Sequence, residues 1–195
     1  MHGLINRAIQ CFVRDTYGHE IWLETARRAG LEDATFEAML IYEDHLTQQV
    51  LAQLAQVLNK PSAALLEDLG TYLVSHPNVE ALRRLLRFGG VSFMEFLHSL
   101  DDLPERGRMA VSDLELPQLE LKENAVSQMQ LHVKSQYDGF GPVLLGLLRA
   151  MADDYGALVV LELHPAGAGH DVIDITLIET AFAEGRRFSL SAGHG

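Results

Sequence analysis

The period of the hydrophobic pattern changes near residue 110, and this change constrains the fold more than any other feature of the chain. Before it, apolar residues recur at the three- and four-residue spacing of one helix face. The two clearest stripes are Leu4, Ile5, Ala8, Ile9 and Phe12, and Val50, Leu51, Leu54, Val57 and Leu58. After it, apolar and polar residues alternate, as in half-buried strands. The chain is therefore predicted to be helical in its first half and to form a sheet in its second.

Local signals set the expected helix boundaries. Pro61 and Ser62 should open a helix that stops at His76, because a residue that precedes a proline avoids the helical region. Ser92 is placed to cap a helix that runs to Leu103. We expect Pro104, the next residue, to end that helix.

The second half alternates strands with one long helix. Strands are predicted around Pro117, where the alternating leucines run from 114 to 121, and at Met129 to Val133. Val143 to Tyr155 predicts a largely apolar helix closed by Gly156. Two further strands, 158–163 and 172–178, should form a hairpin through the glycine-rich turn at 165–169.

Charge and composition exclude several classes of function. The net charge of -12 argues against a nucleic-acid groove, which needs a clustered basic surface. No apolar run reaches membrane-spanning length and no charged leader precedes an apolar core, so we expect no membrane insertion and a cytoplasmic protein. Cys11 is the single cysteine, which excludes an intrachain disulfide and a multi-thiolate metal site.

Catalytic motifs are missing from the chain. It contains no phosphate-binding loop of the Gly-x-x-x-x-Gly-Lys-Ser/Thr type and no Gly-x-Ser-x-Gly elbow. The adjacent carboxylates Asp101-Asp102 and Asp153-Asp154 diverge by about 100° on a helix and do not form a catalytic dyad. We expect no enzymatic activity.

Several matches, spread along the chain, together carry a family resemblance. The opening residues 1–9, then Tyr17-Gly18 and Trp22, are followed by Leu100-Asp101-Asp102-Leu103 and by residues 129–132 leading to 146–148. In these segments the chain resembles H-NOX (heme nitric oxide/oxygen binding) domains over about residues 1 to 180. The resemblance implies an α+β fold, in which a helical lobe precedes an antiparallel sheet of about four strands with one crossing helix. It implies one domain at 1–182, with the helical lobe at 1–60, a helix-plus-sheet lobe at 61–182, and a flexible tail at 183–195.

The resemblance also assigns heme-pocket positions, and three of these bear residues other than those the family uses for its chemistry. In the family, the iron-binding histidine follows Leu-Asp-x-Leu, and that position here is Pro104. Proline has no group that coordinates iron, so we expect histidine-ligated heme to be absent. The family's propionate-binding Tyr-x-Ser-x-Arg motif corresponds to Val133, Ser135 and Tyr137. Of the three motif residues, this chain keeps only the serine. The remaining pocket positions are Pro117, against the heme face, and Ile5, Leu97, Leu116 and Met129.

Another side chain could replace the missing ligand. His98 lies six residues before Pro104 on the same predicted helix and points about 120° away, so it would miss the iron. His132 alternates with apolar neighbours and should face solvent. His164 and His170 flank the hairpin turn and could approach each other, and two other conceivable ligands are Lys134 and Tyr137.

Three functional hypotheses follow. The first is a degenerate sensor that binds another apolar or amphipathic molecule in an inter-lobe pocket. It would act on a separate signalling partner, for which the family suggests a histidine kinase, a diguanylate cyclase or a chemotaxis component. The second is a heme-based gas sensor with an unusual axial ligand. The third is a ligand-free protein-interaction module.

Overall fold

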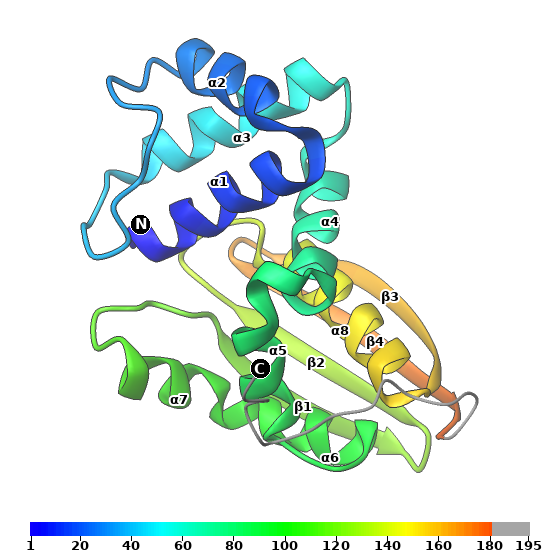
Figure 1. The fold of residues 1–195 in the computed structure, drawn as a ribbon. Coiled ribbons are helices and arrows are strands. Elements are labelled where there is room, and N and C mark those ends of the chain that lie inside the picture. Colours follow the sequence, from blue (N-terminus) through cyan, green and yellow to red (C-terminus); the bar gives the residue numbers. More distant parts are fainter. Residues whose placement is uncertain (181–195) are drawn as a thin grey trace, which may run out of the picture.

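The computed structural model describes residues 1–180 and divides their buried side chains between two cores. Helices occupy most of the chain up to residue 110, and the sheet follows (Figure 1). The predicted α+β class is confirmed, including the change of period. The predicted tail at 183–195 lies outside the described residues.

Residues 1–60 contain three helices, and α4 follows them. Their bounds are α1 Gly3–Tyr17, α2 His19–Arg28, α3 Asp44–Leu58 and α4 Ser62–Ser75. The indole N–H of Trp22, which is fully buried, donates to the Ala34 carbonyl at 2.6 Å and so holds the loop between α2 and α3. The first core forms around this tryptophan. Its largest fully buried members are Phe12, Trp22, Leu54 and Leu65.

Short helices connect α4 to the sheet. They are the 3₁₀ turn Pro77–Val79, α5 Glu80–Arg87, α6 Phe93–His98, the 3₁₀ turn Ser99–Asp102 and α7 Leu103–Ala110. Ser92 caps α6 as predicted, since its hydroxyl accepts the Glu95 N–H at 3.2 Å. The prediction that Pro104 ends a helix is wrong. Pro104 lies in the first turn of α7, where a helix needs no N–H donor and tolerates proline.

A four-stranded antiparallel sheet and the helix α8 make up the rest of the fold. The strands are β1 Gln118–Ala125, β2 Gln128–Lys134, β3 Leu158–Gly167 and β4 His170–Glu179, in the order β1-β2-β4-β3. α8, Phe140–Tyr155, crosses one face of the sheet, and Gly156 closes it in the left-handed conformation. Residues 114–117, predicted as strand, are extended chain without pairing, and the hairpin turn is shorter than predicted because β3 continues through Pro165.

Two glycines set the distance between α4 and α8. A Cβ atom added at Gly70 would overlap the Val143 carbonyl, and one added at Gly146 would overlap the Glu67 carbonyl. The helices therefore pack backbone to backbone. Since α4 contributes Leu69 to the first core and Val74 to the second, this crossing joins the two cores.

Within residues 1–180, no helix is both long and apolar enough to cross a membrane.

Candidate functional site

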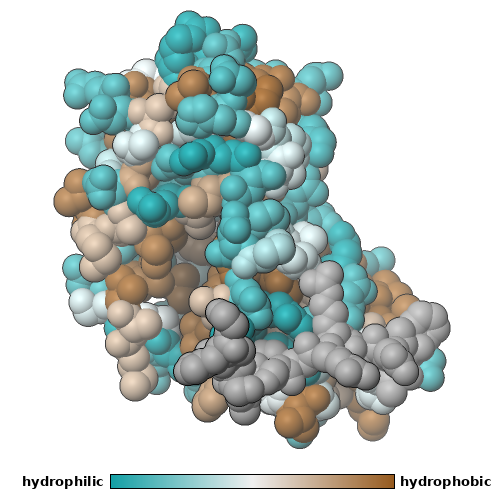
Figure 2. Space-filling view, in the orientation of Figure 1, coloured by the Kyte–Doolittle hydropathy of each residue, from teal (hydrophilic) through white to brown (hydrophobic). Residues whose placement is uncertain are grey.

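An apolar cavity of about 320 Å³ lies between the helical lobe and the sheet lobe. Every side chain that lines it is apolar, and the surface view shows a hollow bordered by hydrophobic residues at this level (Figure 2). The lining comes from α1, α4, α5, α7, α8, β1 and the segment between α7 and β1. Its members include Leu4, Ile5, Ala8, Leu73, Leu82, Leu85, Leu103, Pro104, Gly107, Leu114, Leu116, Pro117, Phe140 and Leu147.

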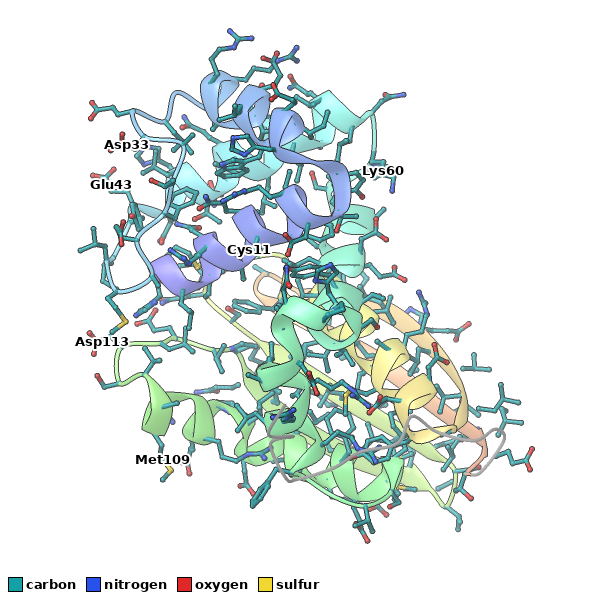
Figure 3. The ribbon with its side chains drawn as sticks, viewed as in Figure 1. Cys11, Asp33, Glu43, Lys60, Met109 and Asp113 are labelled. Carbon is teal, nitrogen blue, oxygen red and sulfur yellow. The ribbon has the colours of Figure 1, made fainter. Side chains whose placement is uncertain are left out.

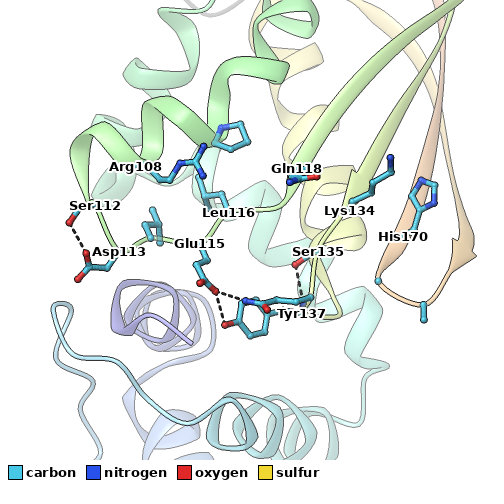
Figure 4. A pocket seen from close by; sticks show the side chains of 15 residues that line it. Arg108, Ser112, Asp113, Glu115, Leu116, Gln118, Lys134, Ser135, Tyr137 and His170 are labelled. Carbon is cyan, nitrogen blue, oxygen red and sulfur yellow. Dashed lines mark hydrogen bonds between the residues drawn. The ribbon is translucent and has the colours of Figure 1, made fainter.

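A second, polar cavity of about 750 Å³ adjoins the apolar one, and the two share Pro104, Leu114 and Leu116. Its polar lining includes Arg108, Glu115, Gln118, Lys134, Ser135, Tyr137 and His170 (Figure 4). The pair resembles a binding site with an apolar interior and a polar entrance.

Four of the sequence-predicted site residues meet at the apolar cavity: Ile5, Pro104, Leu116 and Pro117. Ile5 comes from α1, Pro104 from α7, and the other two from the segment before β1. α7 lies close to that segment at Gly107, where an added Cβ would meet the movable end of Leu116, 2.6 Å from its Cδ1.

The structure does not bring three predicted residues to this cavity. Leu97, Met129 and Val133 are buried in the second core, between α6, the sheet and α8. Met129 and Val133 sit on the sheet face that α8 covers, since strand residues two apart share a face. Val133 also borders a small cavity of about 50 Å³, together with Ser135 and Tyr137.

Ser135 and Tyr137 line the polar cavity. The Ser135 hydroxyl accepts the Tyr137 N–H at 3.0 Å, and the Tyr137 hydroxyl donates to Glu115 at 2.9 Å (Figure 4). Burial, with the hydrogen bond to Glu115 second, raises the pKa of Tyr137. The hydroxyl is therefore neutral at physiological pH, and it ties the chain after β2 to the segment between α7 and β1.

No side chain that commonly binds iron lines the apolar cavity within the described residues, since its lining has no histidine, cysteine, methionine or tyrosine. His98 Nε2 lies 3.2 Å from Glu123 on β1, and His164 Nε2 lies 3.3 Å from Asp174. Lys134 Nζ lies 3.9 Å from Glu120, although its side chain also reaches the polar cavity.

The prediction for His132 needs correction. It does not simply face solvent, because it is half-buried and contacts His170. His132 Nδ1 lies 3.1 Å from His170 Nε2, and the rings stack, because β2 and β4 are neighbours in the sheet. Burial, more than the nearby Lys122, lowers the pKa of His132.

Sequence reasoning missed most of the cavity lining. Leu73, Leu82, Leu85, Phe140 and Leu147 lie on three different helices, α4, α5 and α8. Among these five residues, Leu85 stands out. It is 40% exposed, although the next residue on α5, Leu86, is buried. A helical stripe shows that a residue faces inward, but it does not show whether packed side chains or a cavity lie opposite.

Comparisons with known proteins agree on one family. A family model described as Haem-NO-binding matches residues 2–163. Among curated proteins, the soluble guanylate cyclase gcy-31 of Caenorhabditis elegans is 26% identical over 164 residues, which are 84% of this chain and 23% of that protein. The soluble guanylate cyclase 89Db of Drosophila melanogaster is 20% identical over 81% of this chain and 24% of its own length. The chain thus spans about a quarter of these two relatives.

Solved structures cover the chain more completely. The Fe(II) unliganded H-NOX protein from K. algicida matches with a TM-score of 0.79 and 19% identity, over 92% of this chain and 97% of that one. An H-NOX protein from S. oneidensis in the Fe(II)NO state matches with a TM-score of 0.76 and 19% identity, over 91% and 99%. At these identities the likeness shows a shared fold.

Proposed function

Because the chain belongs to the Haem-NO-binding family, we propose that it is a sensory domain whose ligand binds in the apolar cavity between the lobes. The proposal depends most on one observation: Pro104, at the family's iron-ligand position, lines both the apolar cavity and its polar entrance. The position that would hold iron therefore still faces the site, but it carries a side chain that cannot coordinate a metal.

The residues of this chain do not fit heme held through an axial ligand in that cavity. The lining offers no coordinating side chain, and the entrance offers Tyr137, already bonded to Glu115, where the resemblance expects an arginine. A neutral phenol donates one hydrogen bond, whereas arginine binds a carboxylate through two charge-assisted ones. We propose that the ligand is an apolar or amphipathic molecule without a metal.

The shape of the site supports that class of ligand. Ligand pockets usually span about 300 to 1,000 Å³, and the apolar cavity of about 320 Å³ falls at the lower end. Its apolar walls favour a hydrocarbon or ring system, and the adjoining entrance, with Arg108 and Lys134, can solvate a polar or anionic group.

The output of this sensory domain is proposed to reach a separate signalling protein in the cytoplasm, such as a histidine kinase, a diguanylate cyclase or a chemotaxis component. α7 is a suitable reporter, because Pro104 and Gly107 face the cavity while Met109 is 87% exposed and points away from it (Figure 3). A ligand that displaces α7 would therefore change the outer surface.

A second candidate is heme with an unusual axial ligand, since Lys134, Tyr137 and His170 line the polar cavity beside Pro104. Purification of the chain from heme-supplemented cells separates the two. We expect no Soret band and far less than one heme per chain, both for the natural chain and for Pro104→His, which restores a ligand but leaves Val133 and Tyr137 in place. Stoichiometric heme in the natural chain would overturn the proposal.

The cavity itself can be tested with 1-anilinonaphthalene-8-sulfonate, a probe with apolar rings and an anionic group. Ala8→Leu adds a side chain that extends into the apolar cavity and should weaken probe binding at least tenfold. Ala63→Leu makes the same change on the exposed first turn of α4 and should leave binding unchanged. Equal probe affinity in both variants would contradict a ligand site between the lobes and favour the ligand-free interaction module.

A further inference from the structure

The sheet face opposite α8 carries a cluster of metal-binding side chains that the proposed function does not use. Side chains alternate along each strand, so the face that buries Met129, Leu131 and Ile173 leaves the other face to polar residues. On that second face, Glu162 and His164 lie two residues apart on β3. Asp174 on β4 is paired directly with Glu162 in the register of the sheet.

The three side chains converge. One ligand atom from each of Glu162, His164 and Asp174 lies within 4.8 Å of the others, and His164 Nε2 is 3.3 Å from Asp174 Oδ2. Two ligands of one tetrahedral zinc ion, each about 2.0 to 2.2 Å from it, lie about 3.3 to 3.6 Å apart. The side chains of His164 and Asp174 are 55% and 38% exposed, so small rotations bring all three atoms into that range.

A neighbouring residue orients one of the ligands. The side-chain amide of Gln130 on β2 donates to Asp174 Oδ1 at 2.8 Å, which leaves Oδ2 directed at His164. Metal-binding carboxylates are commonly held by such an outer hydrogen bond. Gln130 is paired with Asp174 in the sheet, so the register itself places this donor.

The charges also favour a cation. Two carboxylates directly opposite each other on adjacent strands repel. Within residues 1–180, no lysine or arginine forms an ion pair with Glu162 or Asp174. A divalent ion between them would remove the repulsion.

We propose that Glu162, His164 and Asp174 bind a divalent transition-metal ion, Zn²⁺ before the harder Mg²⁺ or Ca²⁺, on the open face of the sheet. An imidazole nitrogen with two carboxylate oxygens is a set that zinc accepts, whereas Mg²⁺ and Ca²⁺ take oxygen ligands almost alone. Three protein ligands leave the fourth position to water, in the exposed direction.

The test is a Zn²⁺ titration of the full chain in competition with a chromophoric chelator, with circular dichroism as the check of folding. We expect one ion per chain, at least tenfold weaker binding in His164→Gln and Asp174→Asn, and a 10- to 100-fold loss in Gln130→Ala. Mg²⁺ at the same concentration should not compete.

Two matched variants separate this site from other histidines. His98→Gln removes a surface histidine that faces a single carboxylate, Glu123, at 3.2 Å, and it should leave Zn²⁺ affinity unchanged. His132→Gln breaks the His132–His170 pair on the same sheet face and should also have no effect. Zn²⁺ affinity that survives His164→Gln, or is lost in His132→Gln, would overturn the proposal. Heme and the cavity probe play no part in this measurement, so its outcome is independent of the proposed function.

Discussion

At the scale of single residues, the polar groups that link separate elements are the informative ones. Asp15 near the end of α1 accepts the Tyr72 hydroxyl of α4 at 2.6 Å and the Asn78 side-chain amide at 2.9 Å. Asp154 at the end of α8 is buried and pairs with Arg83 of α5 at 2.6 Å. Each carboxylate holds together helices that the sequence separates.

The first prediction concerns Asp15 and pH. The Tyr72 hydrogen bond, more than the one from Asn78, lowers the pKa of Asp15 below its ordinary 3.8, although partial burial opposes the shift. The unfolded chain therefore takes up this proton first as the pH falls. The stabilisation is complete above about pH 3.8 and is lost as the pH drops through the folded-state pKa.

Urea unfolding of the natural chain and of Asp15→Asn, at pH 7 and at pH 3, measures this effect. The variant should be less stable at pH 7, because it lacks the charge that the hydrogen bonds of Tyr72 and Asn78 favour. We expect a loss of only about 1 kcal/mol, since water screens a carboxylate near the surface. The difference should shrink at pH 3. A difference that stays constant between the two pH values would show that the charge of Asp15 does not matter.

At the scale of elements, the crossing of α4 and α8 positions the site. α4 places Leu73 on the apolar cavity and α8 places Phe140 and Leu147 there. The crossing is tight because Gly70 and Gly146 lie against backbone atoms of the opposite helix. The cavity walls therefore depend on two residues that do not line it.

We predict that Gly146→Ala destabilises the protein, although alanine favours a helix by about 1 kcal/mol over glycine. The added methyl would overlap the Glu67 carbonyl, and overpacking of this kind costs about 1 to 3 kcal/mol. Gly107→Ala is the matched control on α7, since its methyl meets the movable end of Leu116. Thermal unfolding should show a clear loss for the first variant and a small change for the second. Equal stability in both would refute the tight crossing.

At the scale of the whole molecule, two cores share one helix. The first core surrounds Trp22, and the second lies between the sheet, α6 and α8 around Leu131. Because α4 packs into both, loss of one core removes part of the support of the other. The lobes should therefore unfold together.

We predict a single unfolding transition. Leu131→Ala, in the second core, should cost about 2 to 5 kcal/mol, as is usual for a fully buried leucine. Trp22 is the single tryptophan of the chain, so its fluorescence reports the first core. In Leu131→Ala, the urea midpoint from Trp22 fluorescence should fall together with that from circular dichroism. A Trp22 midpoint that stays at the natural value would mean that the lobes unfold separately.

Local chemistry made much of this protein predictable from sequence. The change of period near residue 110, the Ser92 cap, the end of α4 before Pro77 and the closure of α8 by Gly156 depend on residues close together in the chain. The family resemblance rests on short motifs and is confirmed over residues 2–163. The resemblance also assigned Pro104 to the ligand pocket, and Pro104 lines the apolar cavity.

Tertiary structure alone decided what each inward-facing residue meets. The stripe of α1 divides between the first core, which takes Ile9, and the cavity, which takes Leu4 and Ala8, while Ile5 contacts both. Leu97 and Met129 pack in the second core instead. Strand order placed His132 beside His170 and Glu162 opposite Asp174. No local pattern contains such contacts, because each depends on which remote segment arrives next to it.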